Sequence, residues 1–309
     1  MQLEGIHHIT AITGDAPANV EFYVGVLGLR LVKKTVNQDD PTVYHLFYAD
    51  EQGSPGADLT FFEYPGAARG RPGAGMVHRI VWRVGSPAAL DFWEERLTGR
   101  GVEAVRTGAG LLFSDPEGLD HELVVEDVPD APLIADAPDI PREHALQGFA
   151  GVRAYAHDPE RSAALLRDTL GFTGGEDGAW EVRGSERGGT YVYDAPPETA
   201  PRQGAGSVHH IAFATRLDEQ QSWRERVARS GARPTEVIDR FYFRSVYFRE
   251  PSGVLFELAT MGPGFDADED AAHLGERLSL PPRFEPLREQ LERALTPLPD
   301  PRVGTRAAR

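Results

Sequence analysis

The chain repeats one strand–helix–strand unit, and this repetition constrains its fold more than any other feature. Near the start it reads GIHHITAIT and then FYVGVLGLRLV, and from Gly148 it reads GFAGVRAYA and then LLRDTLGFTGG. Gly5 and Gly28 are 23 residues apart, as are Gly148 and Gly171. Self-similarity at a fixed spacing indicates repeated structural units. We expect Gly28 and Gly171 to end helices, since glycine tolerates the left-handed conformation.

A second pair of units follows another version of the same pattern. MVHRIVWRV resembles SVHHIAFAT, and each is followed by a helical stretch and a hairpin, FSDPEGLDHELVV or FREPSGVLFELAT. Pro116 precedes Glu122 by six residues, as Pro251 precedes Glu257. The sequence therefore predicts four βαβββ modules. A single module leaves sheet edges unpaired, so we expect an α+β fold in which the modules form two paired, curved mixed sheets around a cavity.

The modules divide the chain into two halves and a tail. We expect an N-terminal half at 1–126 (modules 1 and 2), a proline-rich linker at 127–147 and a C-terminal half at 148–262 (modules 3 and 4). In the remaining 263–309, apolar residues recur at helical spacing from Glu285 onward. This C-terminal helical tail is expected to be a cap or lid.

Composition excludes several classes of site and partner. The chain has no cysteine, which excludes disulfides, thiolate metal ligands and a cysteine nucleophile. Its net charge of −16 opposes binding to nucleic acid. It shows no apolar run long enough to span a membrane and no secretory signal, so we expect a cytoplasmic protein without a membrane partner. Sheet edges and the tail are compatible with a homo-oligomer.

Histidines occur in two adjacent pairs, His7-His8 and His209-His210, each on the first strand of a module. Neighbouring strand residues face opposite sides, so one histidine of each pair should enter the cavity. Glu257 lies in the apolar strand VLFELAT, where an unpartnered carboxylate would be costly to bury. Two imidazoles and one carboxylate are the donor set of non-haem Fe(II) oxygenases, and Mn(II) or Zn(II) would fit the same ligands. Taken singly, each residue is equally compatible with an ordinary core or surface role.

The other two modules provide an internal control. Alignment places Gly151 opposite His8 and Arg79 opposite His210, whereas Glu122 still matches Glu257. Neither glycine nor arginine completes a metal shell. The sequence therefore predicts one metal per chain, held between modules 1 and 4.

The chain resembles the vicinal oxygen chelate superfamily, which includes glyoxalase I, extradiol dioxygenases and antibiotic-resistance proteins. More narrowly, it is similar to ring-cleaving dioxygenases that act on hydroquinones and chlorohydroquinones. The resemblance spans essentially the whole chain and is carried by GIHHITAITGDAPANVEFYVGVLGLRLVKKTVNQDDPTVYHLFYAD, GSVHHIAFAT and DRFYFRSVYFREPSGVLFELATMGPGF. It implies that His8, His210 and Glu257 bind Fe(II). It also implies that Tyr247 and Arg240 hydrogen-bond the bound phenolic oxygen or the oxygen intermediate.

Strand alternation predicts different orientations for Tyr247 and Arg240. A hairpin turn after Glu250 would place Tyr247 opposite Glu257 on the same face. Arg240 would face away unless a bulge or a strand start reorients it. The alternative for Arg240 is an ordinary salt bridge with Asp239 or Glu250. By the same alternation His7 and His209, which could donate hydrogen bonds near the site, should not contact it directly.

The resemblance implies a ring-cleaving dioxygenase that takes a small aromatic diol, such as a chlorinated or alkylated hydroquinone, and O2. Two alternatives remain at this stage. A glyoxalase-type lyase or isomerase would need a second carboxylate as base near the metal, and none is evident in the sequence. A non-catalytic binding protein would hold its ligand without metal.

Overall fold

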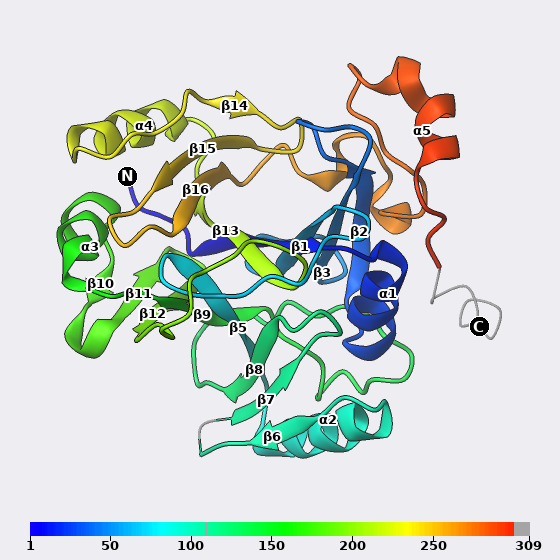
Figure 1. The fold of residues 1–309 in the computed structure, drawn as a ribbon, viewed down its shortest axis with the longest axis horizontal. Coiled ribbons are helices and arrows are strands. Elements are labelled where there is room, and N and C mark those ends of the chain that lie inside the picture. Colours follow the sequence, from blue (N-terminus) through cyan, green and yellow to red (C-terminus); the bar gives the residue numbers. More distant parts are fainter. Residues whose placement is uncertain (109, 300–309) are drawn as a thin grey trace.

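The computed structural model describes residues 1–108 and 110–299, which form two eight-stranded mixed sheets (Figure 1). The strand order is β14-β15-β16-β13-β1-β4-β3-β2 in the first sheet and β10-β11-β12-β9-β5-β8-β7-β6 in the second. The first sheet thus joins module 4 to module 1, and the second joins module 3 to module 2. This confirms the predicted α+β fold of four modules in two paired, curved sheets.

The first sheet is built from the two ends of the chain. Module 1 comprises β1 (Ile6–Thr13), α1 (Ala16–Val20), η1 (Glu21–Val26), β2 (Arg30–Val36), β3 (Tyr44–Ala49) and β4 (Asp58–Glu63). Module 4 comprises β13 (Ser207–Thr215), α4 (Gln220–Arg229), β14 (Ile238–Asp239), β15 (Arg244–Arg249) and β16 (Leu255–Thr260).

The second sheet is built from the middle of the chain. Module 2 comprises β5 (Met76–Val84), α2 (Pro87–Gly99), β6 (Ala104–Arg106), β7 (Gly110–Ser114) and β8 (Asp120–Val125). Module 3 comprises β9 (Phe149–Tyr155), α3 (Glu160–Ala164), η2 (Leu165–Leu170), β10 (Thr173–Gly174), η3 (Glu176–Gly178), β11 (Ala179–Arg183) and β12 (Gly188–Asp194).

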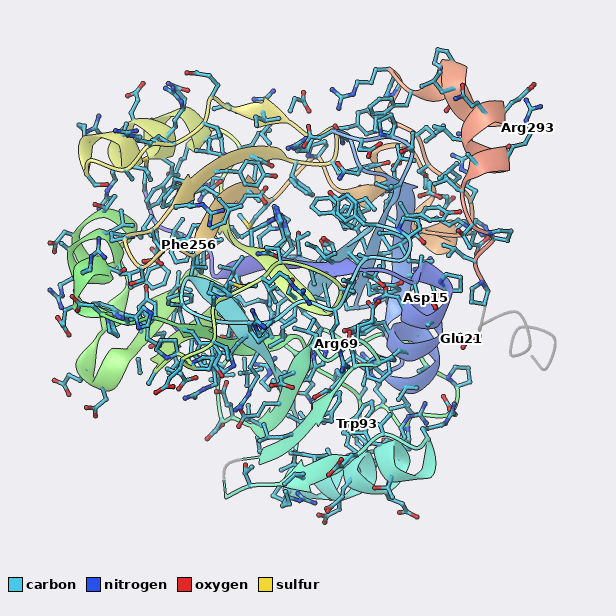
Figure 2. All side chains as sticks on the ribbon, viewed as in Figure 1. Asp15, Glu21, Arg69, Trp93, Phe256 and Arg293 are labelled. Atoms are coloured by element: carbon cyan, nitrogen blue, oxygen red, sulfur yellow. The ribbon has the colours of Figure 1, made fainter. Side chains whose placement is uncertain are left out.

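The helices of modules 1 and 3 end where the sequence predicts. Gly28 follows η1 with φ of 72°, and Gly171 caps η2 with φ of 79°. These positive φ angles favour glycine because it has no Cβ. Large apolar side chains such as Trp93 of α2 and Phe256 of β16 are buried, whereas Arg293 lies at the periphery (Figure 2). No helix within the described part of the chain combines the length and apolar character needed to cross a bilayer.

Every module begins with a bulged strand. Where β1 pairs antiparallel with β13, the register skips His7 on one strand and His209 on the other. Where β5 pairs with β9, it skips His78 and Ala150. A bulge inserts one extra residue and changes the face to which neighbouring side chains point. The bulges therefore determine the directions in which the two side chains of each His-His pair point.

The C-terminal segment packs against the first sheet. It contains η4 (Phe265–Ala267), η5 (Ala271–His273), η6 (Glu285–Leu287) and α5 (Arg288–Ala294). The helix expected from Glu285 is present, as one tight turn followed by α5. Residues 300–309 of the predicted tail lie outside the described residues. The predicted linker, 127–147, has neither helix nor strand.

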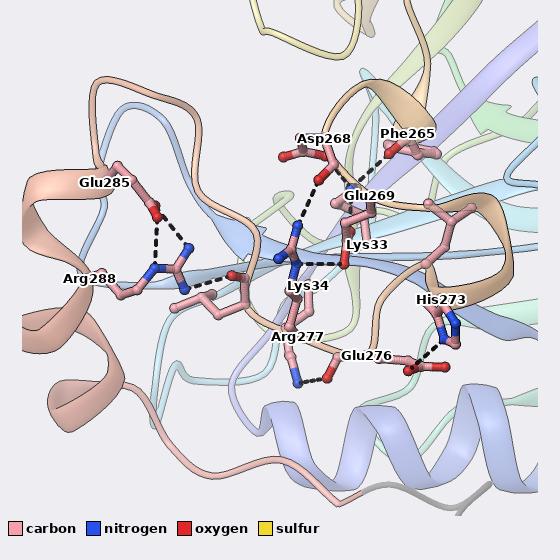
Figure 3. A network of polar contacts seen from close by, with 12 residues as sticks. Lys33, Lys34, Phe265, Asp268, Glu269, His273, Glu276, Arg277, Glu285 and Arg288 are labelled. Atoms are coloured by element: carbon pink, nitrogen blue, oxygen red, sulfur yellow. Dashed lines mark hydrogen bonds and ion pairs between the residues drawn. The ribbon is translucent and has the colours of Figure 1, made fainter.

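A buried lysine joins this segment to β2 (Figure 3). Lys33 has no exposed side-chain surface, and its Nζ donates to the Phe265 carbonyl at 2.8 Å and to Asp268 at 2.7 Å. It also forms an ion pair with Glu269, which is itself buried. Tyr242 covers the ammonium at 4.7 Å and donates to the same Asp268. A fully buried ammonium requires such partners, so the segment is fixed to the sheet.

Candidate metal centre

The first sheet brings three predicted ligands to one point. His8 on β1, His210 on β13 and Glu257 on β16 lie on adjacent strands, and all three are buried. Glu257 Oε2 is 3.1 Å from His8 Nε2 and 2.8 Å from His210 Nε2. The two Nε2 atoms are 3.2 Å apart. The three donor atoms thus lie close together, although their residues are up to 249 positions apart in the sequence.

The tautomer of His8 follows from its neighbour His7. His7 Nε2 lies 3.2 Å from the Thr260 carbonyl, which can only accept, so this nitrogen carries a proton. Burial and the adjacent His8 lower the pKa of His7 to about 3, so its ring is neutral and Nδ1 is an acceptor. His8 Nδ1, at 2.9 Å, must then be the donor. His8 Nε2 faces Glu257 and His210, and in the neutral ring this nitrogen carries the lone pair that a metal needs.

The second pair repeats this contact. His209 Nδ1 is 2.8 Å from His210 Nδ1. Burial, followed by the neighbouring His210, lowers the pKa of His209 to about 4. Strand alternation predicts that neither His7 nor His209 contacts the site. Neither lines the cavity, and each, at a bulge, hydrogen-bonds a predicted ligand.

This donor set fits a divalent cation. Neutral imidazoles and an ionised carboxylate are the forms that bind metal. Glu257 Oε1 has no hydrogen-bond partner among the described residues although it is fully buried. A buried carboxylate that faces lone pairs needs positive charge. The ligand positions alone do not identify the metal.

Tyr247 lies where the hairpin predicts. It pairs with Glu257 across β15 and β16, and its ring is 5.5 Å from that of His210. Burial and the charge of Glu257 raise the pKa of Tyr247, so the phenol keeps its proton. It can therefore donate a hydrogen bond into the cavity.

Arg240 also reaches the cavity. β14 ends at Asp239, and Phe241 has a positive φ of 71°, so strict alternation does not apply here. The guanidinium binds the two carboxylate oxygens of Asp39 at 3.1 and 2.9 Å and lies 5.7 Å from the Tyr247 ring. Its acidic partner thus comes from module 1 rather than from Asp239 or Glu250.

The cavity beside the cluster is lined by aromatic and polar side chains from both modules, including the charged pair Asp39 and Arg240. Sequence reasoning missed most of these residues, which lie on β1 to β4 and in the 240–243 segment: Thr10, Thr35, Asn37, Gln38, His45, Phe47, Phe62, Tyr242 and Phe243. Alternation in YHLFYA would have placed His45 and Phe47 on one face. A larger cavity, of about 1020 Å³, lies between η1 and β7–β8 and contains none of the predicted ligands.

The corresponding position in the second sheet holds an ion pair. Arg79 Nη1 is 3.0 Å from Glu122 Oε2, so a guanidinium satisfies the carboxylate. At Gly151 an ideal Cβ would lie 2.1 Å from Thr190 Oγ1 and 2.4 Å from its carbonyl oxygen. Both metal-compatible clusters that the described residues form lie in the first sheet. This arrangement agrees with the predicted single site.

The crowding at Gly151 has a measurable consequence. We expect Gly151→Ala to reduce the free energy of unfolding by about 1–3 kcal/mol, because the added methyl overlaps the backbone of β12. Gly25→Ala is the matched control, since a Cβ there meets nothing within 4 Å. It should be neutral or stabilising by about 0.5–1 kcal/mol in urea denaturation. Equal stability of the two variants would contradict the steric argument.

Paired βαβββ modules with candidate ligands on their first and last strands define a protein of the vicinal oxygen chelate type. The model of the Glyoxalase/Bleomycin resistance protein/Dioxygenase superfamily matches residues 5–123 and 148–258. The chain belongs to this superfamily.

Relatives cover nearly the whole chain. MhqA of Bacillus subtilis (strain 168), provisionally named a ring-cleaving dioxygenase, is 40% identical over 96% of this chain and 100% of its own length. The chlorohydroquinone/hydroquinone 1,2-dioxygenase of Sphingobium indicum is 33% identical over 95% of this chain and 96% of its own length. A crystal structure of a provisionally named dioxygenase from Bacillus subtilis matches with a TM-score of 0.90 at 39% identity, covering 96% of this chain and 98% of that one. Glyoxalase I from Zea mays shares the fold, with a TM-score of 0.57 at 14% identity, over 88% of this chain and 96% of that one.

Proposed function

We propose that this protein is an Fe(II)-dependent, extradiol-type ring-cleaving dioxygenase that acts on hydroquinone-like aromatic diols with O2. The observation that carries the proposal is the convergence of two imidazoles and one carboxylate at a buried, aromatic-lined cavity. The names of the relatives support the same reaction class and substrate class.

In this proposal His8, His210 and Glu257 hold the metal and leave its cavity side open. Bound iron would supply the Lewis acidity and the electron transfer that O2 needs to react with a closed-shell ring. His7 Nδ1 accepts a hydrogen bond from His8 Nδ1–H and so fixes the candidate ligand's tautomer and ring orientation. Such outer hydrogen bonds increase the basicity of the ligand.

The remaining residues bind and orient the substrate. Tyr247 would donate a hydrogen bond to a substrate oxygen in the cavity, because its raised pKa keeps the phenol protonated. Arg240, fixed by Asp39, would add positive potential to the same wall. Aromatic side chains such as Phe243, whose ring is 5.1 Å from His8, keep water from the bound ring.

The structure contains a carboxylate near the cluster that the sequence did not reveal. Asp58 is buried, its oxygens have no hydrogen-bond partner among the described residues, and it groups with His7 and His8. It does not line the cavity. Burial, with further contributions from Asp50 and Glu257, raises the pKa of Asp58 well above its usual range. Because Asp58 does not face the cavity, it is not placed to take a proton from a substrate there, as the base of a glyoxalase-type reaction must, and this favours the dioxygenase.

An oxygen electrode tests the proposal. After anaerobic loading with Fe(II), we expect O2 uptake that depends on hydroquinone and is stoichiometric with loss of the aromatic absorbance. Apoprotein prepared with a chelator should take up none. An iron-loaded sample that consumes no O2 with hydroquinone, chlorohydroquinones, alkylhydroquinones or catechols would overturn the proposed function.

A further inference from the structure

One histidine of the cavity has no role in holding the metal. His45 lies on β3, and its ring packs between Phe47, with centroids 4.0 Å apart, and Phe62, at 4.3 Å. It lines the same cavity as His8 and His210. The two phenyl rings fix the plane of the imidazole, so its nitrogens keep a defined direction.

Hydrogen bonds fix one side of this ring. His45 Nε2 is 2.9 Å from Thr60 Oγ1, which is 2.8 Å from Thr10 Oγ1. The other nitrogen, Nδ1, has no hydrogen-bond partner among the described residues. Burial, together with the nearby His8 and His210, lowers the pKa of His45 well below its usual range, so the ring is neutral. A neutral imidazole with one nitrogen engaged has a single remaining hydrogen-bonding position.

The chemistry of that position favours a hydroxyl group. The Thr60 hydroxyl can donate or accept, so it can bond His45 Nε2 in either tautomer of the ring. Nδ1 is an acceptor in the tautomer with the proton on Nε2 and a donor in the other. A ligand hydroxyl matches both cases, whereas a carboxylate matches only the donor and an ammonium only the acceptor.

The charges around the cavity disfavour an anionic substituent on the substrate. Arg240 lines the cavity, but both carboxylate oxygens of Asp39 bind its guanidinium. Lys33, behind Tyr242, is neutralised by Asp268 and Glu269. Each cation thus has a carboxylate partner among the described residues, so neither leaves an uncompensated positive charge for a ring carboxylate. Glu257 adds negative charge at the cluster and would repel one.

We propose that His45, supported by Thr60 and Thr10, binds the second hydroxyl of the substrate, the one that does not meet the metal. The cavity would thereby select neutral diols over phenols with one hydroxyl and over diols that carry a ring carboxylate. This inference rests on the proposed function, and it assigns the recognition of the second hydroxyl to one side chain.

The test compares ligands that differ by one group. Dissociation constants of hydroquinone, phenol and 2,5-dihydroxybenzoate are measured anaerobically by calorimetry on the Fe(II)-loaded full chain. The wild type should prefer hydroquinone to phenol by roughly tenfold, since one buried hydrogen bond differs. The carboxylate-bearing diol should bind at least about tenfold more weakly than hydroquinone. Equal or tighter binding of phenol or of the carboxylate would overturn the inference.

The variant His45→Phe keeps the ring between its aromatic neighbours and removes the nitrogen. Its iron content and its affinity for phenol should stay within about twofold of wild type, while its preference for hydroquinone falls to about one. His273→Phe, on an exposed turn far from the cavity lining, should retain the wild-type preference. An unchanged preference in His45→Phe would overturn the inference.

Thr60→Val and Thr60→Ser keep the inference testable if His45→Phe fails to fold. Valine leaves Nε2 without its partner and should reduce the hydroquinone preference severalfold, whereas serine should restore it. Valine without effect would count against the inference. If wild-type protein takes up O2 with hydroquinone but His45→Phe still prefers hydroquinone to phenol, only this inference is defeated. Iron-loaded wild type that takes up no O2 with hydroquinone, chlorohydroquinones, alkylhydroquinones or catechols defeats the proposed function as well.

Discussion

Replacing Glu257 with glutamine should remove the metal and the activity together. The change keeps the shape of the side chain but deletes the only negative charge among the three ligands. We expect Fe(II) affinity to fall by about 100-fold or more and O2 uptake to fall by at least about a thousandfold. Metal analysis after anaerobic reconstitution and gel filtration measures the first effect, and the oxygen electrode measures the second.

Glu122 provides a matched control within the same chain. It occupies the equivalent position on β8, but Arg79 rather than a pair of histidines faces its carboxylate. Glu122→Gln should leave iron content unchanged. A Glu257→Gln protein with wild-type iron, or a Glu122→Gln protein without it, would mean that the metal lies elsewhere.

Loss of the Lys33 ammonium should destabilise the protein by about 3–5 kcal/mol. Lys33→Met preserves the length of the side chain but leaves the carboxylates of Asp268 and Glu269 without their buried counter-charge. Glu269 is only 2% exposed, so water cannot replace the lysine. Guanidinium denaturation monitored by tryptophan fluorescence gives the free energy of unfolding. Combining the change with Glu269→Gln should recover part of the loss, because it removes one uncompensated charge.

The adjacent lysine provides the comparison. Lys34 lies on the same strand but donates to the Glu276 carbonyl at an exposed position. Lys34→Met should change the free energy of unfolding by less than about 1 kcal/mol. Equal effects of the two substitutions would show that burial of Lys33 does not hold the C-terminal segment in place.

Repetition made much of this architecture predictable. Equal spacings in the two halves indicated four modules, and the degenerate residues Gly151 and Arg79 indicated which modules share the candidate site. The hairpin count placed Tyr247 opposite Glu257, and this pairing is present. These inferences succeeded because they depend on local periodicity and on alignment of one segment with another.

The remaining features depend on contacts that local patterns do not encode. His7 and His209 lie at one-residue bulges, where each hydrogen-bonds the neighbouring candidate ligand, and alternation alone cannot reveal a bulge. Arg240 hydrogen-bonds Asp39, which precedes it by 201 positions in the sequence. The segment around Arg240 is irregular, so alternation does not predict this contact. His45 is an unremarkable strand residue until the curved sheet places it beside the ligands.

The pairing of β1 with β13 determines when the site can first exist during synthesis. His8 and His210 are 202 residues apart, and Glu257 follows 47 residues later. A ribosome that has released only the first half presents β1 without its antiparallel neighbour. Pairings of such long range form slowly and leave strand edges exposed in the meantime. Assembly of the three-residue cluster must therefore follow completion of module 4, and truncated chains should accumulate as aggregation-prone species that lack it.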